Sequence, residues 1–549
     1  MPFSRRFVAV LVVMAVVSST AHADVLFVDN CTGPGGGTDG VSFSSIQAAI
    51  DAAVDGDEVV VAPCTYFENI NFLGKAICLR SSNGSEVTTI DALGMGRVVT
   101  CISGEGPDTI LDGFTITGGN TGGLGGGMLN QGSSPTLTNC NFTGNQACPI
   151  SGAGGGMANL NGSPTVTDCA FTDNLAGLFG GGMVNFNSSP TVTNCTFSGN
   201  TSNNKGGGMT NGSGSAVVTD CTFTGNTALG GGGGMSNGAG SSPILTNCIL
   251  DGNTAGEGGG AMHNFGSSPT LINCTFTRNL DGPVGAGGIF NDGFNSSVTL
   301  VVLNCVFWDN FENQIREVGE NSDTTVLYTN IQGGWPGLGN INALPMFVDP
   351  DNGDLRLQPA SPCIDAGDNT AVPQDIVTDL DGNPRFLEIP ETPDTGLGEL
   401  PIVDMGVFEA LGGGCLAVTS QQVVCHADGT TFTINIEGLN ACTGGTTQVT
   451  FTASGGSVGE QLCFTTLVND GGFCCSTEIC VTIPDCTPAG LPSDLDGDGI
   501  VGMVDFLALL GAWGTCSDCG AAQACPADFD GDCSVDIHDL LVLLGSWTG

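Results

Sequence analysis

The chain has 549 residues and a formal net charge of −45, from 55 acidic and 10 basic residues. A charge of this sign argues against nucleic acid and anionic membranes as binding partners. Glycine occurs 89 times, but 40% of the residues are hydrophobic, so the glycine indicates a repeated structure and not general disorder. The length suggests several domains, and 25 cysteines are unusual for a protein of the reducing cytosol.

Residues 1–23 have the pattern of a secretory signal peptide. Arg5 and Arg6 precede an apolar run at 7–17, and Ala21-His22-Ala23 is a small-residue cleavage site. The apolar run is too short to span a bilayer comfortably, and no later stretch is long enough for a transmembrane helix. We therefore expect an extracellular protein, either secreted or associated with the cell surface.

An internal repeat organises the middle of the chain. Its cysteines are separated by 29, 26, 26, 27, 26 and 31 residues, and an asparagine follows each of them five positions later. These pairs are Cys140 and Asn145, Cys169 and Asn174, Cys195 and Asn200, Cys221 and Asn226, Cys248 and Asn253, Cys274 and Asn279, and Cys305 and Asn310. Between them, glycine-rich stretches end in Met128, Met157, Met183, Met209, Met235, Met262 and Ile289, each with an asparagine two positions on.

A period near 26 residues, with short β-type runs and no helical periodicity, predicts stacked coils of parallel strands. Each coil would place its Cys, Phe and Met side chains inward, above those of the previous coil. The asparagine columns would form hydrogen bonds along the stack, with about 4.8 Å between strands. Side chains in one column point the same way, so we favour a buried ladder of thiols over disulfides.

These repeats resemble right-handed parallel β-helix proteins of the pectin-lyase-like superfamily, and the GGGM-x-N and F-x-x-N units are similar to the repeats of polymorphic outer-membrane proteins. The resemblance covers roughly residues 25–410 and implies a mainly β solenoid at 24–411. Residues 45–53 have apolar positions at helical spacing and are expected to form an N-terminal capping helix. Residues 349–409 resemble the terminal segment called choice-of-anchor Q, which implies a C-terminal cap.

Residues 412–490 are predicted to form a separate cysteine-rich β module. Eight cysteines occur between Cys415 and Cys486, among alternating β-type runs. A small β-sandwich-like module with about four disulfides fits this composition, and the sequence leaves the pairing open.

The last segment, 491–549, carries a duplicated calcium-loop pattern. Acidic residues stand at loop positions 1, 3, 5 and 12, and position 7 supplies a backbone carbonyl. The predicted ligands are Asp494, Asp496, Asp498, Ile500 and Asp505 in the first loop, and Asp528, Asp530, Asp532, Ser534 and Asp539 in the second. An apolar helix is expected after each loop, so the sequence predicts Ca²⁺ as the cofactor.

This loop-helix pair resembles a type I dockerin, a calcium domain of the EF-hand type. The resemblance implies a cohesin-like or other cell-surface partner and a context of polysaccharide breakdown. The second loop departs from the pattern, because Cys533 occupies the position of the usual glycine. Four nearby cysteines, including Cys533, allow a zinc site as an alternative, although an exported chain favours two disulfides.

Candidate catalytic residues on the solenoid are few. Aligning the repeats places Asp251, Arg278 and Asp309, together with Trp308, on one side of three successive coils. Arg278 could act as a base and the aspartates could hold a cation or substrate, but the same positions suit a solvated turn with an ion pair.

Two functions remain open from the sequence. The first is a secreted, calcium-binding β-helix surface protein that acts as an adhesive or polysaccharide-binding scaffold. The alternative is a polysaccharide lyase or glycoside hydrolase that the dockerin-like tail recruits to an assembly. The sequence has no specific catalytic motif that decides between them.

Overall fold

The computed structural model describes residues 23–29 and 42–411, apart from 239, 283–284, 295, 388 and 390–391, together with the backbone of five strands between 416 and 482 and residues 506, 509, 514–515 and 534–535. The chain divides into two compact units, Met1–Ala410 and Leu411–Gly549. The expected signal peptide at 1–23 lies almost wholly outside the described residues.

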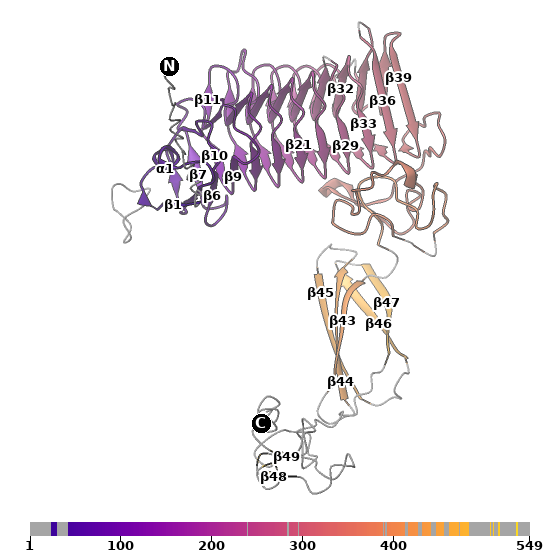
Figure 1. Cartoon of the computed structure of the whole chain (residues 1–549). Coiled ribbons are helices and arrows are strands. Elements are labelled where there is room, and N and C mark those ends of the chain that lie inside the picture. The colour runs from indigo at the N-terminus through magenta and orange to yellow at the C-terminus, as the bar shows by residue number, and fades with distance from the viewer. Residues whose placement is uncertain are drawn as a thin grey trace, which may run out of the picture. The chain divides into compact units, whose positions relative to one another are not determined.

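The first unit is a parallel β-helix (Figure 1). Its coils stack so that each strand pairs in parallel with the equivalent strand of the next coil, for example Phe142 with Phe171 and Met157 with Met183. Four parallel sheets run along the stack. The predicted mainly β solenoid is therefore confirmed.

Two of the sheets meet at a tight corner, and we call them sheet A and sheet B. In stacking order, sheet A contains β2 (Ser42–Phe43), β1 (Val25–Val28), β3 (Glu58–Val61), β6 (Cys78–Ser81), β9 (Ile110–Asp112), β13 (Thr136–Thr138), β17 (Thr165–Thr167), β21 (Thr191–Thr193), β25 (Val217–Thr219), β29 (Ile244–Thr246), β33 (Thr270–Ile272), β36 (Val298–Leu303) and β39 (Ser322–Leu327). Sheet B contains β4 (Thr65–Tyr66), β7 (Thr89–Asp91), β10 (Thr115–Thr117), β14 (Asn141–Thr143), β18 (Ala170–Thr172), β22 (Thr196–Ser198), β26 (Thr222–Thr224), β30 (Ile249–Asp251), β34 (Thr275–Thr277), β37 (Val306–Trp308) and β40 (Asn330–Ile331).

The other two sheets complete each coil, and we call them sheet C and sheet D. Sheet C contains β5 (Ile70–Asn71), β8 (Val99–Cys101), β12 (Met128–Gln131), β16 (Met157–Leu160), β20 (Met183–Phe186), β24 (Met209–Gly212), β28 (Met235–Gly238), β32 (Met262–Phe265), β35 (Ile289–Asp292) and β38 (Ile315–Val318). Sheet D contains β11 (Asn120–Thr121), β15 (Gln146–Ala147), β19 (Leu175–Ala176), β23 (Thr201–Ser202), β27 (Thr227–Ala228) and β31 (Thr254–Ala255).

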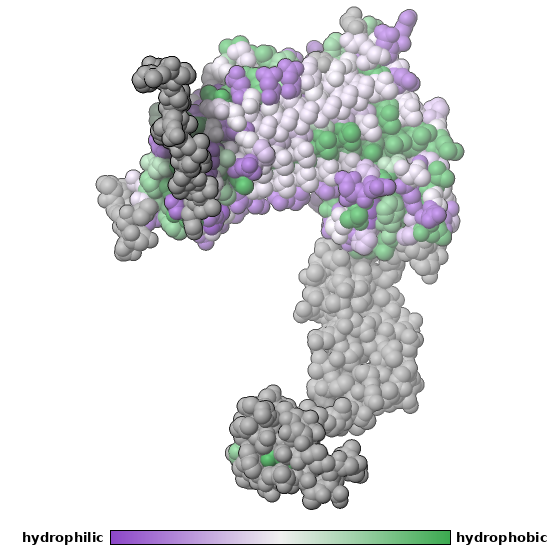
Figure 2. Space-filling model, viewed as in Figure 1, coloured by the Kyte–Doolittle hydropathy of each residue, from purple (hydrophilic) through white to green (hydrophobic). Residues whose placement is uncertain are grey.

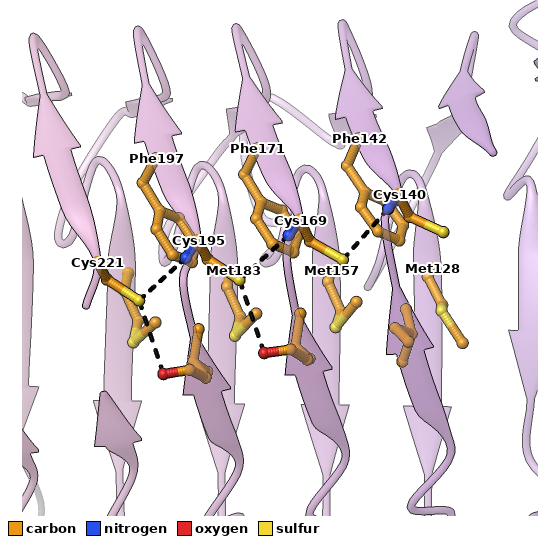
Figure 3. Packing of buried hydrophobic residues seen from close by; sticks show 14 of the residues in the cluster. Met128, Cys140, Phe142, Met157, Cys169, Phe171, Met183, Cys195, Phe197 and Cys221 are labelled. Atoms are coloured by element: carbon orange, nitrogen blue, oxygen red, sulfur yellow. Dashed lines mark hydrogen bonds between the residues drawn. The ribbon is translucent and has the colours of Figure 1, made fainter. Parts of the chain in front are cut away.

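The interior is built from columns of identical side chains. The Cys, Phe and Met residues of the repeat point inward and are buried, as expected (Figure 3). Neighbouring rings in the phenylalanine column stack, with centroids 4.7 Å apart between Phe171 and Phe197. The column cysteines are thiols, and the backbone N–H of Cys169 donates to Sγ of Cys195 at 3.4 Å. The predicted thiol ladder is therefore confirmed.

The asparagine columns satisfy polar groups inside this apolar core. Nδ2 of Asn226 donates to Oδ1 of Asn253 at 2.9 Å and to the carbonyl of Phe197 at 2.8 Å, and its Oδ1 accepts from Asn200 in the preceding coil. A second column joins the asparagines of sheet C in the same way, for example Asn185 to Asn211 at 2.9 Å. Both predicted hydrogen-bonded columns are present.

The corner between sheets A and B requires left-handed backbone. One residue per coil turns this corner with φ between 50° and 55°, at Asn139, Asp168, Asn194, Asp220, Asn247, Asn273 and Asn304. Asn and Asp tolerate this conformation better than other non-glycine residues. Asp168 and Asp220 therefore replace asparagine in this corner column.

The N-terminal end is covered by the expected helix, α1 (Ile46–Ala52). The Ser45 side chain accepts from the N–H of Ala48, and the carboxylate of Glu68 accepts from the N–H groups of Ile46 and Gln47. These bonds satisfy backbone donors that the first turn of a helix leaves unpaired. Ile46, Ala49 and Ile50 face the core.

Residues 345–410, which we call the flank segment, lie along the side of the last coils. Oγ1 of Thr275 accepts from the N–H of Val407, and Asn247 and Asn304 donate to the carbonyls of Thr378 and Asp368. The segment contains β41 (Phe347–Asp349), β42 (Asp354–Leu357) and the 3-10 helices Pro350–Asn352 and Asn369–Ala371. Two of these bonds involve the corner column, because the corner asparagines of these coils still have side-chain groups to satisfy.

The second unit contains antiparallel strands. Three form one sheet, β43 (Leu416–Cys425), β44 (Thr431–Asn440) and β45 (Thr446–Ser454), and two form another, β46 (Gln461–Asp470) and β47 (Phe473–Thr482). Near the C-terminus, β48 (Gly514–Thr515) pairs with β49 (Ser534–Val535).

Candidate functional site

The outer faces of sheets A and B carry no charge over the middle of the solenoid. In sheet A from β13 to β25 and in sheet B from β14 to β26, the central residue of each strand is buried and its two neighbours point outward. The 16 outward residues are Thr136, Thr138, Asn141, Thr143, Thr165, Thr167, Ala170, Thr172, Thr191, Thr193, Thr196, Ser198, Val217, Thr219, Thr222 and Thr224. In a chain of net charge −45, these outward residues form a neutral array rich in hydroxyl groups, and Asp168 and Asp220 stand at the corner between its two halves.

Figure 2 shows a broad pale region over the solenoid, as expected for threonine, serine and glycine. The nearest acidic residues of these coils sit at corners, for example Asp168 and Asp220 between sheets A and B. The stacked columns underneath hold the outward hydroxyl groups at the strand spacing, about 4.8 Å along the stack. The two sheets therefore present a regular, rigid array of donors and acceptors.

The structure brings together two of the three predicted catalytic residues. Nε of Arg278 donates to Oδ1 of Asp251 at 2.8 Å, and its Nη2 forms an ion pair with the other carboxylate oxygen. Nη1 of Arg278 donates to the carbonyl of Pro350 in the flank segment. The hydrogen bond to Asp251 raises the pKa of Arg278 above its usual value, burial acts in the opposite direction, and the Asp251 charge adds to the rise. A raised pKa opposes the loss of the proton that a general base must make.

The third predicted residue, Asp309, lies in the next coil, and its charge adds to the rise in the Arg278 pKa. Its backbone N–H donates to Oε1 of Gln332 at 2.8 Å. Trp308 packs partly buried against the hydrophobic cluster of the flank segment, so its ring is not an open sugar platform. Arg278 and Asp309 both occupy left-handed turn positions, with φ of 53° and 58°.

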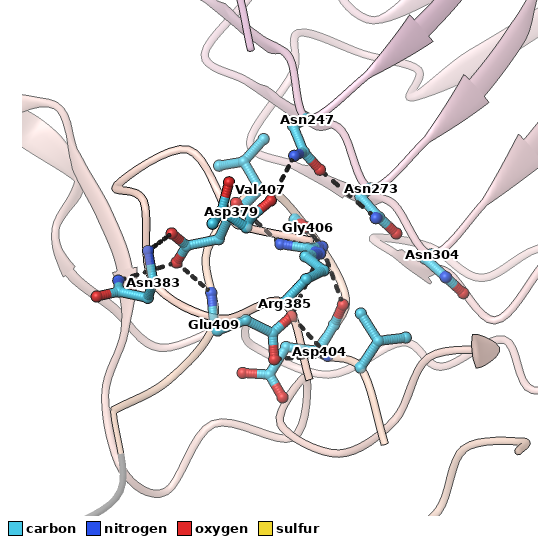
Figure 4. Close-up of polar contacts among 12 residues, drawn as sticks. Asn247, Asn273, Asn304, Asp379, Asn383, Arg385, Asp404, Gly406, Val407 and Glu409 are labelled. Atoms are coloured by element: carbon cyan, nitrogen blue, oxygen red, sulfur yellow. Dashed lines mark hydrogen bonds and ion pairs between the residues drawn. The ribbon is translucent and has the colours of Figure 1, made fainter. Parts of the chain in front are cut away.

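A buried charged cluster holds the flank segment together (Figure 4). Arg385 is fully buried, pairs with Glu409 at 3.3 Å and donates to the carbonyls of Gly406 and Val407. Burial raises the pKa of Asp404 to about 7 and raises that of Glu409 well above its usual value. These residues belong to the segment that resembles choice-of-anchor Q, but their contacts could not be predicted, because only the path of the flank segment brings them together.

The repeats of this solenoid match the model of a known protein family. The model of the right-handed β-helix region matches residues 25–227 and 183–331, which together cover more than half of the 549 residues. The chain belongs to the right-handed β-helix family.

Two solved structures are similar to this β-helix protein over much of its length. One is the enzymatically active domain of tailspike protein 4 of bacteriophage CBA120, at 12% identity, with a TM-score of 0.28, covering 78% of this chain and 60% of that one. The other is the tailspike protein gp49 of Acinetobacter baumannii bacteriophage Fri1, a capsular polysaccharide depolymerase, at 10% identity, with a TM-score of 0.26, covering 84% and 82%. No curated protein matches the sequence. Likenesses this weak carry no argument about the ligand.

Nine of the ten predicted calcium ligands lie outside the described residues, and the tenth, Ser534, is described only as part of strand β49. Within the part of the chain that the structure describes, no group of three or more His, Cys, Asp and Glu side chains is arranged to hold a metal ion. The described helices include none that is long and apolar enough to cross a membrane.

Sheet C carries a further group of side chains that the repeat analysis did not single out. Lys205, His263, Phe265 and Phe290 lie on or beside its outer face, and the His263 and Phe290 rings are 5.6 Å apart. The repeat alignment does contain a sign of this group of side chains. The outward column that has Phe186 and Phe265 is interrupted by glycine in the two coils between them.

Proposed function

We propose that this β-helix protein is a secreted or cell-surface scaffold that binds polysaccharide along sheets A and B. The observation that carries the proposal is the uncharged array of outward residues from Thr136 to Thr224, of which 12 of 16 are threonine. Hydroxyl groups donate and accept hydrogen bonds, as sugar hydroxyls do. A rigid stack loses little conformational freedom when it binds a long polymer.

The alternative, a polysaccharide lyase or glycoside hydrolase, is less well supported. A lyase would need Arg278 to release a proton, and the ion pair with Asp251 opposes this. A glycoside hydrolase would need two available carboxylates, and Asp251 is bound to Arg278. The flank segment also contacts Arg278 through Pro350, which leaves less room for a substrate at that position.

The experiment is affinity electrophoresis of the full secreted chain in gels that contain neutral polysaccharides, with a chelator present. Thr193→Glu on sheet A should weaken retention about fivefold or more, because it places a charge inside the neutral array. Asn203→Glu is the matched control, since Asn203 is exposed outside these two sheets. Equal retention of Thr193→Glu and Asn203→Glu would contradict binding through this array. Cleavage of the polymer that persists in Asp251→Asn and is lost in Thr193→Glu would contradict a scaffold without catalytic activity.

We also propose that residues 491–549 bind Ca²⁺ and dock onto a cohesin-like or other cell-surface protein. Two loops with carboxylates at equivalent positions support this, because Ca²⁺ prefers six to eight oxygen ligands. Equilibrium dialysis of the full chain should detect two tightly bound ions, and Asp494→Asn or Asp528→Asn should each remove one. Unchanged binding in both variants would refute the assignment.

Export from the cytoplasm belongs to the same proposal. Residues 1–23 have the pattern of a signal peptide, and Cys64 is disulfide-bonded, which suits an oxidising compartment. The N-terminal sequence of the protein recovered from culture medium tests it. A chain that keeps Met1 and remains in the cytoplasm would contradict the proposal.

A further inference from the structure

One basic side chain has no hydrogen-bond or ion-pair partner among the described residues. Eight basic residues follow residue 23, and the structure describes all of them. Seven donate to carboxylates or to backbone carbonyls, namely Lys75, Arg80, Arg97, Arg278, Arg316, Arg356 and Arg385. Lys205 differs: its Nζ lies over the ring of Phe265, 5.5 Å from the centroid, and no described residue forms a hydrogen bond or ion pair with it.

The surface around Lys205 is partly aromatic. Phe186 and Phe265 occupy the same outward column of sheet C, three coils apart, which is about 14 Å at the usual strand spacing. Gly212 and Gly238 take the two positions between them. The Phe186 ring lies against Gly212, where an added Cβ would come within 2.9 Å of Cδ1. Backbone and ring faces therefore form the surface here, without intervening side chains.

The charges near Lys205 leave its ammonium group uncompensated. Burial lowers the pKa of Lys205, and the charge of Asp292, beside Phe265 in the next coil, opposes this shift but forms no ion pair with the ammonium group. His263 is 5% exposed, and burial and the Lys205 charge lower its pKa to about 3, so it is neutral. The outward residues of β16, β20, β24, β28 and β32 include no carboxylate.

We propose that Lys205 and Phe265 form a binding site for a negatively charged substituent, a carboxylate or a sulfate ester, on a polysaccharide. The inference rests on the proposed polysaccharide function and adds a second, chemically distinct surface to it. Phe265 packs against the sugar ring, and the three N–H donors of Lys205 bind the anion. The net charge of −45 does not prevent this, because at physiological salt charges are screened beyond about 8 Å.

The same geometry would also arise if Lys205 only shielded Phe265 from water. Substitutions separate the two roles. Lys205→Met keeps the aliphatic contact and removes the charge, and Lys205→Arg keeps the charge. Arg80→Met is the matched control, since it changes the net charge equally on the outer face of sheet A. Asp292→Asn removes the opposing carboxylate and should strengthen binding, a gain that misfolding cannot produce.

The test is affinity electrophoresis of the full chain, with a chelator, in gels that contain dextran sulfate, alginate or unmodified dextran. We expect stronger retention by a charged polymer than by dextran, and dextran sulfate and alginate identify the anion as sulfate or carboxylate. Lys205→Met should weaken retention by the charged polymer roughly tenfold, while Lys205→Arg retains it.

Two outcomes overturn the inference. If Lys205→Met behaves like Arg80→Met, or if dextran retains the protein as well as both charged polymers do, Lys205 is not an anion site. Retention by neutral polymers that Thr193→Glu weakens would then leave the proposed function standing. If no charged or neutral polymer retains the protein, the proposed function and this inference both fail.

Discussion

Arg278 lies one coil beyond Asp251 and donates to both of its carboxylate oxygens. The Asp251 side chain is 9% exposed, against 25% for Arg278, so the carboxylate depends on this one guanidinium for compensation. The pair also anchors the flank segment, because Arg278 donates to the carbonyl of Pro350. Residues that resemble a catalytic pair in the sequence thus have a structural role in the fold.

Removing the cation should therefore cost stability. Arg278→Met leaves the Asp251 carboxylate nearly buried without a partner, and we expect a loss of about 2–4 kcal/mol, seen as a lower urea midpoint. Arg80→Met is the comparison, because its pair with Glu58 is about one third exposed on both sides and should cost less than about 1 kcal/mol. Equal losses in the two variants would show that Arg278 does not hold the flank segment.

The asparagine column should be intolerant of substitution. Asn226 is fully buried, donates twice and accepts from Asn200, so Asn226→Asp removes two donors and buries a charge. We expect a loss of at least about 3 kcal/mol, measured by chemical denaturation. Asn203→Asp, at an exposed position, should change stability by less than about 0.5 kcal/mol. A small effect at both positions would mean that the column does not stabilise the stack.

The flank segment should loosen as the pH rises. Asp404 is almost fully buried, and its pKa of about 7 in the folded protein is above the ordinary value of 3.8. An acid with a raised pKa binds its proton more tightly when folded. Its stabilisation is therefore complete below about pH 4 and is lost as the pH rises through about 7.

Hydrogen exchange of the flank segment measures this dependence. Protection in the wild-type protein should fall between pH 5 and pH 8, after correction for the intrinsic exchange rate. Asp404→Asn cannot ionise, and it should show a flatter profile even if its protection is lower throughout. Parallel profiles in the two proteins would assign the dependence to other groups, of which Glu409 is the nearest candidate.

Cys148 should be the fast-reacting thiol of the β-helix. The Ser151 hydroxyl donates to its Sγ at 3.5 Å, and this bond with nearby backbone N–H groups lowers the pKa of Cys148 to about 7. Burial instead raises the pKa of Cys221 and Cys248 in the thiol column. A disulfide reagent should thus react with Cys148 in the native protein and with the column only after unfolding.

The pH profile of this reaction provides the check. Cys148→Ser should abolish the fast phase, and Ser151→Ala should shift its midpoint from about pH 7 toward higher pH, because it removes the largest cause of the lowered pKa. A fast phase that persists in Cys148→Ser would place the reactive thiol elsewhere in the chain.

The repeat alone determined the solenoid. Cys, Phe, Met and Asn recur at one period, and identical side chains can stack only if each coil is paired in register with the next. This reasoning predicted the thiol column and the asparagine column at Asn226. It also predicted helix α1, because Ile46, Ala49 and Ile50 lie on one helical face.

The tertiary structure decided what covers the coils and where irregular side chains point. How far Arg278 is covered depends on the path of a segment more than 70 residues away, which brings Pro350 to it. Arg385 and Asp404 have no repeat to place them, and the contact of Lys205 with Phe265 joins two different coils. Periodicity fixes which residues share a column, but a side chain that leaves its column, or a segment without a repeat, is positioned only by packing.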